Sequence, residues 1–333
     1  MTHEELKNRV YGYLIKYKKE ELKIEDKGVT SGGNEYDCLI PEPYCKQTYP
    51  IMLYPGIKNT VADIQGCAFA YKPHPASRTH VASSQTACLN LFAPILESEH
   101  ADTILKASGV APAGFDHIER SQLRKGYCFE YWDSESKGSK GILGDHNSRA
   151  GTDSDVAICY QDVNGNLCLW LIEHKLTEKE FTECGGYKSK GNCNKELCRT
   201  STLSTLYSNH KLCYYDSRCG YDYWDIMEGR AAKQLFSGQY CGNGCPFKGG
   251  MNQLWRNQMM ALELERMGKF HNVFFSVVTH PENGLLDASM REYRKLINNS
   301  PKFSDFKSDR LVKAAESYLP NWAAWYKRVY LGK

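Results

Sequence analysis

The feature that most constrains the fold of this chain is a hairpin pattern in residues 151–175. Residues 156–160 alternate Val, Ile and Tyr with Ala and Cys, the period-two pattern of a half-buried strand. Residues 167–172 form an almost continuous apolar run, which is typical of a buried strand. Between them, Asn164-Gly165 readily adopts the positive φ angles of a tight turn. The sequence therefore predicts two strands joined by a hairpin turn.

Polar side chains gather at one end of this hairpin. Side chains two residues apart on a strand face the same way, so Glu173 and Lys175 project together, while His174 points to the opposite face. Asp155 begins the first strand and lies near the end of the second strand once the hairpin closes. Two carboxylates and one ammonium group should therefore meet at one edge of a sheet.

This group of side chains suits metal-dependent hydrolysis. Asp155 and Glu173 are candidate ligands for Mg²⁺ or Mn²⁺, because Mg²⁺ takes one or two carboxylates and completes its shell with water and substrate phosphate. The backbone carbonyl of His174 could add an oxygen. Lys175 could orient the attacking water or stabilise the developing negative charge. We expect phosphodiester hydrolysis; the alternative is a solvated hairpin that bears only a surface ion pair.

Further elements flank the hairpin in a definite order. Ser83 can cap a helix over residues 84–96, and residues 126–132 have the pattern of a short strand. After the hairpin, residues 251–267 show helical periodicity and end at Gly268, and residues 271–279 read as a buried strand. The expected order is therefore a helix, three strands, a helix and a strand.

The spacing Asp155, then Glu173-His174-Lys175, resembles the D…(D/E)xK signature of the PD-(D/E)xK nucleases, a superfamily of restriction enzymes, recombination nucleases and CRISPR-associated exonucleases. The segments SSQTACLN, TEKEFTECGGY and CPFKGGMNQLWRNQ resemble a group of bacterial restriction endonucleases within it, over roughly residues 70–300. The resemblance implies an α/β, restriction-endonuclease-like core of order αβββαβ, with a mixed central sheet flanked by helices.

The resemblance also implies roles for individual residues. Asp155 is preferred over Asp153 because it leads directly into the apolar alternation, as the equivalent Asp does in the superfamily. Some members add a Glu from a preceding helix or strand, for which Glu130 is the candidate. Several exonuclease members carry a Gln-containing motif on the next helix, where this chain has Gln253, with Arg256 in place of the motif's Tyr. These helix residues could equally be exposed side chains without a role.

The chain contains fourteen cysteines, which is a high number. No apolar signal segment is present at the N-terminus; instead, Thr2 and Glu5 predict a capping box for a charged amphipathic helix, so we expect a cytoplasmic protein. Disulfides rarely persist in that compartment, which leaves metal binding or packing. The cysteines that suit packing in a core are Cys67, Cys88, Cys128, Cys159 and Cys168.

Seven other cysteines crowd into residues 184–245, a window poor in aliphatic residues that could build little core unaided. Four thiolates could hold a [4Fe-4S] cluster or a structural Zn²⁺, and the spacing alone does not choose. One branch of the resembled superfamily carries a cysteine-bound iron–sulfur cluster, although at other chain positions, and this favours iron–sulfur. The preferred ligands bracket the window and include a Cys-Pro pair: Cys184, Cys198, Cys213 and Cys245. The substitutes are Cys193, Cys219 and Cys241.

We therefore divide the chain into residues 1–66, an N-terminal helix with an irregular segment, and residues 67–333, a nuclease domain. The nuclease domain would contain a Cys-rich insertion at about 184–245 and a helical C-terminal cap with helices through Met290 and Leu296 and through Leu311 and Leu319. The net charge of +3 is too small to establish nucleic-acid binding, although local clusters of Lys and Arg could contact phosphates. No apolar run approaches the ~20 residues that span a bilayer.

The sequence thus predicts a Mg²⁺-dependent deoxyribonuclease of the restriction-endonuclease-like type, with DNA as its partner. One alternative is an iron–sulfur exonuclease of the DNA-repair or CRISPR-associated type. Another is a non-catalytic nucleic-acid-binding protein that holds a metal cluster. A homodimer, in which two subunits would cut both strands, is left open.

Overall fold

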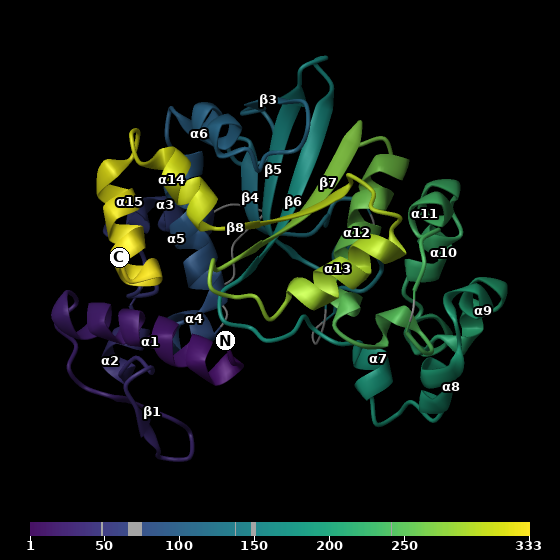
Figure 1. Cartoon of the computed structure of the whole chain (residues 1–333), viewed down its shortest axis with the longest axis horizontal. Coiled ribbons are helices and arrows are strands. Elements are labelled where there is room, and N and C mark those ends of the chain that lie inside the picture. The colour runs from purple at the N-terminus through teal and green to yellow at the C-terminus, as the bar shows by residue number, and fades with distance from the viewer. Residues whose placement is uncertain (48, 66–74, 137, 148–150, 241) are drawn as a thin grey trace.

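The computed structural model describes residues 1–47, 49–65, 75–136, 138–147, 151–240 and 242–333, and it has a mixed α/β fold with helices on both sides of a six-stranded sheet (Figure 1). The mixed α/β class predicted from the sequence is confirmed. The strands are β3 (Phe115–Ile118), β4 (Tyr127–Tyr131), β5 (Ser154–Asp162), β6 (Leu167–Lys175), β7 (Asn272–Thr279) and β8 (Phe303–Lys307). Both β3 and β4 pair with β5, and β7 and β8 continue the sheet parallel to β6.

The predicted hairpin is confirmed and is longer than expected. β5 and β6 pair antiparallel from Val156 opposite Ile172 to Gln161 opposite Leu167. At the turn, Gly165 has a φ of +77°, which glycine adopts without a steric penalty. The Asp162 carboxylate accepts hydrogen bonds from the backbone N–H groups of Asn164 and Asn166, both at 2.9 Å. Turn and pairing together set the register of the two central strands.

Both faces of the sheet are covered, which explains the continuous apolar run in β6. Val156 and Trp170 belong to one core, and Ala157 and Leu171 belong to the other. Helix α5 (Ser84–Leu96) covers the first face, and α12 (Met251–Arg266) covers the second (Figure 1). The predicted cap of α5 is confirmed, because the Ser83 side chain accepts a hydrogen bond from the N–H of Thr86 at 3.3 Å.

The N-terminal helix α1 (His3–Glu20) packs against the C-terminal helices (Figure 1). Its predicted capping box, Thr2 with Glu5, is confirmed. The rings of Tyr17 and Trp325 meet edge-on at 5.6 Å. The other elements before β3 are β1 (Gly28–Val29), β2 (Glu35–Tyr36), α2 (Glu42–Cys45), α3 (Lys58–Gln65), α4 (Pro75–Thr79) and α6 (Ala101–Ser108). The predicted boundary at residues 66–67 and Cys67 lie outside the described residues.

Both helices predicted for the C-terminal cap after Leu285 are present, but a strand that the sequence did not predict lies between them. Helix α13 (Asp287–Leu296) is followed by the strand β8 and then by α14 (Asp309–Ala315) and α15 (Pro320–Tyr326). β8 has five residues, of which only two are buried apolar side chains, so its sequence carries little periodicity. The helix expected through Leu319 ends at Ala315, because Pro320 suits the first turn of a new helix but cannot continue an old one.

The Cys-rich segment forms short helices at the end of the molecule opposite α1 (Figure 1). They are α7 (Gly185–Lys188), α8 (Lys195–Thr200), α9 (Leu203–Ser208), α10 (Tyr223–Met227) and α11 (Arg230–Leu235). Their aromatic side chains pack on α12, where Trp255 stacks on Phe247 with ring centres 4.2 Å apart and lies 5.8 Å from Trp224. In the described part of the chain, no helix has both the length and the apolar character needed to cross a membrane.

Candidate active site

The registers of three neighbouring strands align three carboxylates in one row. In the β4–β5 pair, Phe129 lies opposite Val156 and Tyr131 lies opposite Ser154, so the residues between them, Glu130 and Asp155, stand across from each other. In the β5–β6 pair, Val156 lies opposite Ile172. One step further along both strands, Asp155 meets Glu173. Asp155 is therefore flanked by a glutamate on each neighbouring strand.

These carboxylates share one cavity of about 580 Å³ with Lys175. The cavity lies at the ends of the strands, where the N-terminus of α5 and the loop after β6 approach the sheet. The other residues that line it are Tyr11, Ala76, His80, Ala82, Ser83, Ser84, Gln85, His174, Glu178 and Thr182. The predicted residues Asp155, Glu173, Lys175 and Glu130 thus come together in a polar hollow large enough to receive part of a substrate.

Glu173 is held from two sides. The Lys175 Nζ lies 2.9 Å from Glu173 Oε1, and both side chains are nearly buried. From α12, the Gln253 amide donates to Oε1 at 2.7 Å and the Asn257 amide donates to Oε2 at 2.9 Å. Gln253 is itself oriented by the N–H of Thr182, which donates to its amide oxygen at 3.1 Å. The Glu173 carboxylate is therefore fixed in position before any ligand binds.

Burial and mutual repulsion shift the protonation of the carboxylates. Burial raises the pKa of Asp155 well above its ordinary value, Glu173 and Glu130 raise it further, and the His174 N–H, which donates to Asp155 at 2.6 Å, opposes them. Burial raises the pKa of Glu130 to about 7, against the hydrogen bond that Gln85 donates at 2.9 Å. Although burial lowers the pKa of Lys175, the surrounding carboxylates raise it overall, so Lys175 carries its charge.

Glu130 also departs from ordinary strand geometry. Its φ of +52° lies in the left-handed region, which non-glycine residues rarely adopt. The ladder between β4 and β5 skips this residue and resumes at Tyr131. Strained conformations of this kind concentrate at functional sites. The departure lets the Glu130 side chain reach Gln85 at the start of α5.

His174 faces the other side of the sheet, as predicted. Its ring is fully buried, and burial lowers its pKa to about 3, so the imidazole is neutral. The Ser84 hydroxyl lies 3.2 Å from His174 Nδ1 and 3.1 Å from the His174 carbonyl oxygen, to which it donates. The carbonyl proposed as a metal ligand thus already accepts one hydrogen bond.

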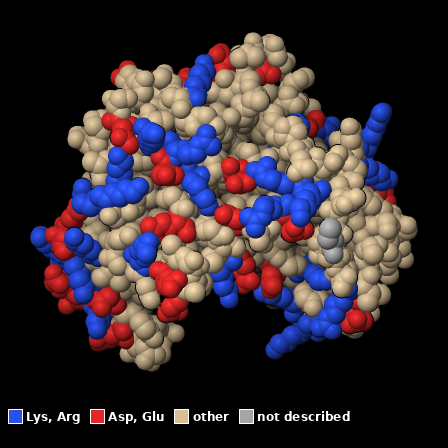
Figure 2. Space-filling model, in the orientation of Figure 1, with Lys and Arg blue, Asp and Glu red and all other residues tan. Residues whose placement is uncertain are grey.

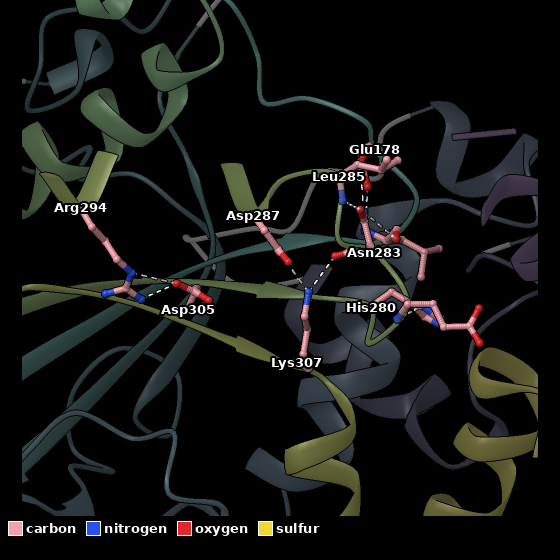
Figure 3. A network of polar contacts seen from close by, with 10 residues as sticks. Glu178, His280, Asn283, Leu285, Asp287, Arg294, Asp305 and Lys307 are labelled. Carbon is pink, nitrogen blue, oxygen red and sulfur yellow. Dashed lines mark hydrogen bonds and ion pairs between the residues drawn. The ribbon is translucent and has the colours of Figure 1, made fainter. Parts of the chain in front are cut away.

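The loop that follows Lys175 is tied to the parallel strands (Figure 3). Asn283, in the loop after β7, donates to the carbonyls of Leu176 and Glu178 at 3.3 and 3.0 Å. Lys307 of β8 donates in turn to the Asn283 carbonyl at 2.7 Å and pairs with Asp287 at 3.3 Å. This network fixes one wall of the cavity, where Glu178 lies.

Two residues considered at the sequence level lie elsewhere. Asp153 pairs with His146 at 3.0 Å and does not line the cavity. Arg256 is partly buried beside Tyr223 and donates to the Gly151 carbonyl at 3.5 Å, so it does not replace the expected Tyr beside the site. Asn257 holds Glu173 instead. Its position one turn after Gln253 on the same helix face was the signal available in the sequence.

Basic side chains do not form one continuous surface on the face drawn in Figure 2, where Lys and Arg are interspersed with Asp and Glu. Several members of the basic clusters noted in the sequence have partners. Lys18 is buried and donates to the backbone carbonyls of Asp26 and Leu39, and Arg328 forms an ion pair with Glu21 at 2.7 Å. Some of the basic side chains in these clusters therefore have partners within the fold.

A comparison with protein families gives a match over nearly the whole chain. The model of the family described as "restriction endonuclease associating with ARP" matches residues 17–331. The chain belongs to this family. As a member of this restriction endonuclease family it has a nuclease-like role, for which DNA is the expected substrate. No curated protein and no solved structure matches the chain.

The site of this restriction endonuclease family member offers carboxylate oxygens to a metal ion. Among the residues that the structure describes, no three His, Cys, Asp or Glu side chains have the arrangement of ligands around one ion. Mg²⁺ needs only one or two carboxylates, because water and phosphate oxygens fill its shell. Burial, together with the neighbouring carboxylates, raises the pKa of Asp155 and of Glu130, and a divalent cation would favour their ionised forms. The donor set thus fits Mg²⁺ or Mn²⁺.

The four preferred cysteines lie together in a second place. Cys184, Cys198, Cys213 and Cys245 line one small cavity beside the N-terminal end of α12. Of the substitutes, Cys193 and Cys219 are exposed and do not line it, and Cys241 lies outside the described residues. Cys88, Cys128, Cys159 and Cys168 are buried, as expected of packing residues.

Proposed function

We propose that the protein is a Mg²⁺-dependent deoxyribonuclease that hydrolyses DNA phosphodiester bonds, acting as a restriction-like endonuclease. The observation that carries this proposal is the row Glu130, Asp155 and Glu173 on three adjacent strands, open to one cavity together with Lys175. Membership of a restriction endonuclease family supports the same chemistry.

Asp155 and Glu173 would hold the metal. Mg²⁺ or Mn²⁺, when bound, supplies positive charge to the phosphate and lowers the pKa of water. The hydrogen bonds from Gln253 and Asn257 keep the Glu173 carboxylate oriented, so little reorganisation is needed on binding. These amides are positioning residues, since they act through Glu173.

Lys175 would act on the reacting atoms directly. Its ammonium group lies at the cavity wall, remains charged, and could orient the attacking water and stabilise the charge that develops on the phosphate. Glu130, with a pKa of about 7, is suited to exchange a proton near neutral pH. Each charged group of the row thus has one task in an in-line hydrolysis.

The test uses a supercoiled plasmid and a single-stranded circle, each incubated with the full chain and Mg²⁺, Mn²⁺ or EDTA. The DNAs are prepared from hosts with and without base methylation, because methylation of the bases could block cleavage. We expect nicked or linear plasmid with Mg²⁺ and none with EDTA. Shortening of linear DNA with both circles intact would favour the exonuclease alternative.

The variant Lys175→Ala separates the enzyme from a binding protein. We expect this variant to lose cleavage and to keep its affinity for DNA in Ca²⁺. If the unmodified protein binds DNA and cleaves none of these substrates with either metal, the nuclease proposal is overturned and the non-catalytic binder is favoured.

A further inference from the structure

Four thiols from four separate segments surround one closed space. Cys184 precedes α7, Cys198 lies in α8, Cys213 lies between α9 and α10, and Cys245 precedes α12. The space that they line measures about 20 Å³. Its remaining walls are largely apolar, formed by Leu197, Leu206, Leu212, Phe247 and Trp255. The thiols are separated by up to 61 residues in sequence, from 184 to 245, so only folding brings them together.

Backbone contacts hold the four segments in this arrangement. The N–H of Cys245 donates to the carbonyl of Cys198 at 3.0 Å, and the N–H of Cys184 donates to the carbonyl of Lys248 at 3.3 Å. Gly244 has a φ of +74°, and a Cβ there would lie 2.1 Å from the Arg199 carbonyl oxygen. Glycine is thus required where the Cys245 segment crosses the Cys198 segment, and the close approach of the two segments is built into the backbone.

Polar groups around the cavity point to a missing acceptor. The Trp224 indole nitrogen and both polar atoms of the Asn252 amide are buried and have no hydrogen-bond partner in the described structure. Both side chains are 1% exposed and line the cavity. Buried polar groups without partners are rare in proteins and indicate an absent ion, water or ligand.

Two other groups already donate hydrogen bonds to cysteine sulfurs of this cavity. The N–H of Tyr187 donates to Cys184 Sγ at 3.4 Å, and the Asn192 amide donates to Cys198 Sγ at 3.9 Å. Neutral thiols are weak acceptors, whereas metal-bound thiolates and the inorganic sulfides of a cluster accept such hydrogen bonds. The hydrogen-bond donors around the cavity therefore suit sulfur atoms that carry negative charge.

We propose that Cys184, Cys198, Cys213 and Cys245 bind a [4Fe-4S] cluster, whose sulfurs accept hydrogen bonds from Trp224 and Asn252. Four thiolates can hold either a cluster or a tetrahedral Zn²⁺. Iron–sulfur is favoured because the inorganic sulfides of a cluster add acceptors for the surrounding donors, whereas Zn²⁺ would leave only the four thiolates. The cluster would join α7, α8 and the segment before α10 to the start of α12.

This proposal does not depend on the proposed nuclease function, since metal content is measured without DNA. The full chain, purified without oxygen, should be brown, with broad visible absorption, and should contain four iron atoms and four acid-labile sulfides per chain. Stoichiometric zinc in place of iron would overturn the cluster. So would a metal-free protein, or a disulfide between any two of the four cysteines in the anaerobic sample.

Variants test the ligands individually. Serine substitution of Cys184, Cys198, Cys213 or Cys245 should remove the visible absorption, whereas Cys193→Ser and Cys219→Ser should leave it unchanged. Because a ligand variant could fail to fold, Trp224→Phe provides a milder probe. This variant should retain the cluster and show a more negative reduction potential, since one hydrogen bond to sulfur is lost. Full absorption in all four ligand variants, or an unchanged potential in Trp224→Phe, would contradict the proposal.

Discussion

The two cavities of this protein differ in size, in lining and in how they are built. The carboxylate cavity measures about 580 Å³, and its residues come mainly from adjacent strands. The cysteine cavity measures about 20 Å³, and its residues come from short helices and the segments between them. A large polar cavity suits a site that admits a substrate, whereas a small closed one suits a group that stays in place. The comparison separates a proposed reaction site from a proposed structural site.

Helix α12 contributes residues both to the cysteine cavity and to the support of Glu173 in the carboxylate cavity. Near its N-terminal end, Asn252 lines the cysteine cavity, and one and a half turns later Asn257 donates to Glu173. Both asparagines are 1% exposed. The helix therefore links the stability of the Cys-rich segment to the orientation of a proposed metal ligand.

The largest effect is expected in the carboxylate cavity. Glu173→Gln and Lys175→Ala should each lower the rate of DNA cleavage by about 10³-fold, because the first removes a proposed metal ligand and the second removes the positive charge that faces the phosphate. Asp153→Asn is the matched control, since Asp153 pairs with His146 outside the cavity, and it should cleave at close to the unmodified rate. Initial rates of plasmid nicking measure this. If Asp153→Asn is as inactive as Glu173→Gln, the assignment of Asp155 over Asp153 fails.

A local loss of structure is expected in the cysteine cavity. Structural metal sites contribute about 10 kcal/mol to the folding of small domains. Cys245→Ser should therefore make residues 184–245 sensitive to proteases, while the sheet remains resistant. Limited proteolysis with mass spectrometry identifies the cut sites, and Cys193→Ser is the control. Equal resistance of the two variants would show that the Cys-rich segment needs no cluster.

The two asparagines of α12 should act on different sites. Asn257→Leu should weaken Mn²⁺ binding by about 10–100-fold, as is typical when a partner of a metal ligand is removed, and should leave iron content unchanged. Asn252→Leu should alter the reduction potential of the cluster and leave Mn²⁺ affinity unchanged. Calorimetric titration and iron analysis of both variants measure the two effects. If either variant changes both its Mn²⁺ affinity and its cluster, the substitution has disturbed the folding of α12 as a whole and the two asparagines do not act on separate sites.

The smallest effect concerns pH in the metal-free protein. The pKa of Glu130 rises from 4.5 to about 7 on folding, so its ionisation disfavours the folded state, and that cost grows between pH 4.5 and 7. Glu130→Gln should therefore match the unmodified protein below pH 4.5 and exceed its stability above pH 7, by about 3 kcal/mol. Urea unfolding in EDTA measures this. A gain that is the same at all pH values would contradict a raised pKa.

The sequence predicted the hairpin well because period-two alternation and an Asn-Gly turn report local geometry. It predicted that Asp155, Glu173 and Lys175 lie close together, and they line one cavity, since the register follows from the turn. It did not distinguish the roles of Arg256 and Asn257, because the angle at which a helix packs on a sheet depends on distant residues. For the same reason β8 was missed: a five-residue strand is defined by its pairing with β7 more than by its own pattern.

The most direct test of two separate metal sites is anomalous X-ray scattering from crystals grown without oxygen and soaked in Mn²⁺. The account predicts manganese between Asp155 and Glu173, and iron enclosed by Cys184, Cys198, Cys213 and Cys245. A carboxylate cavity without manganese at saturating concentration, or zinc in place of iron at the cysteines, would contradict it.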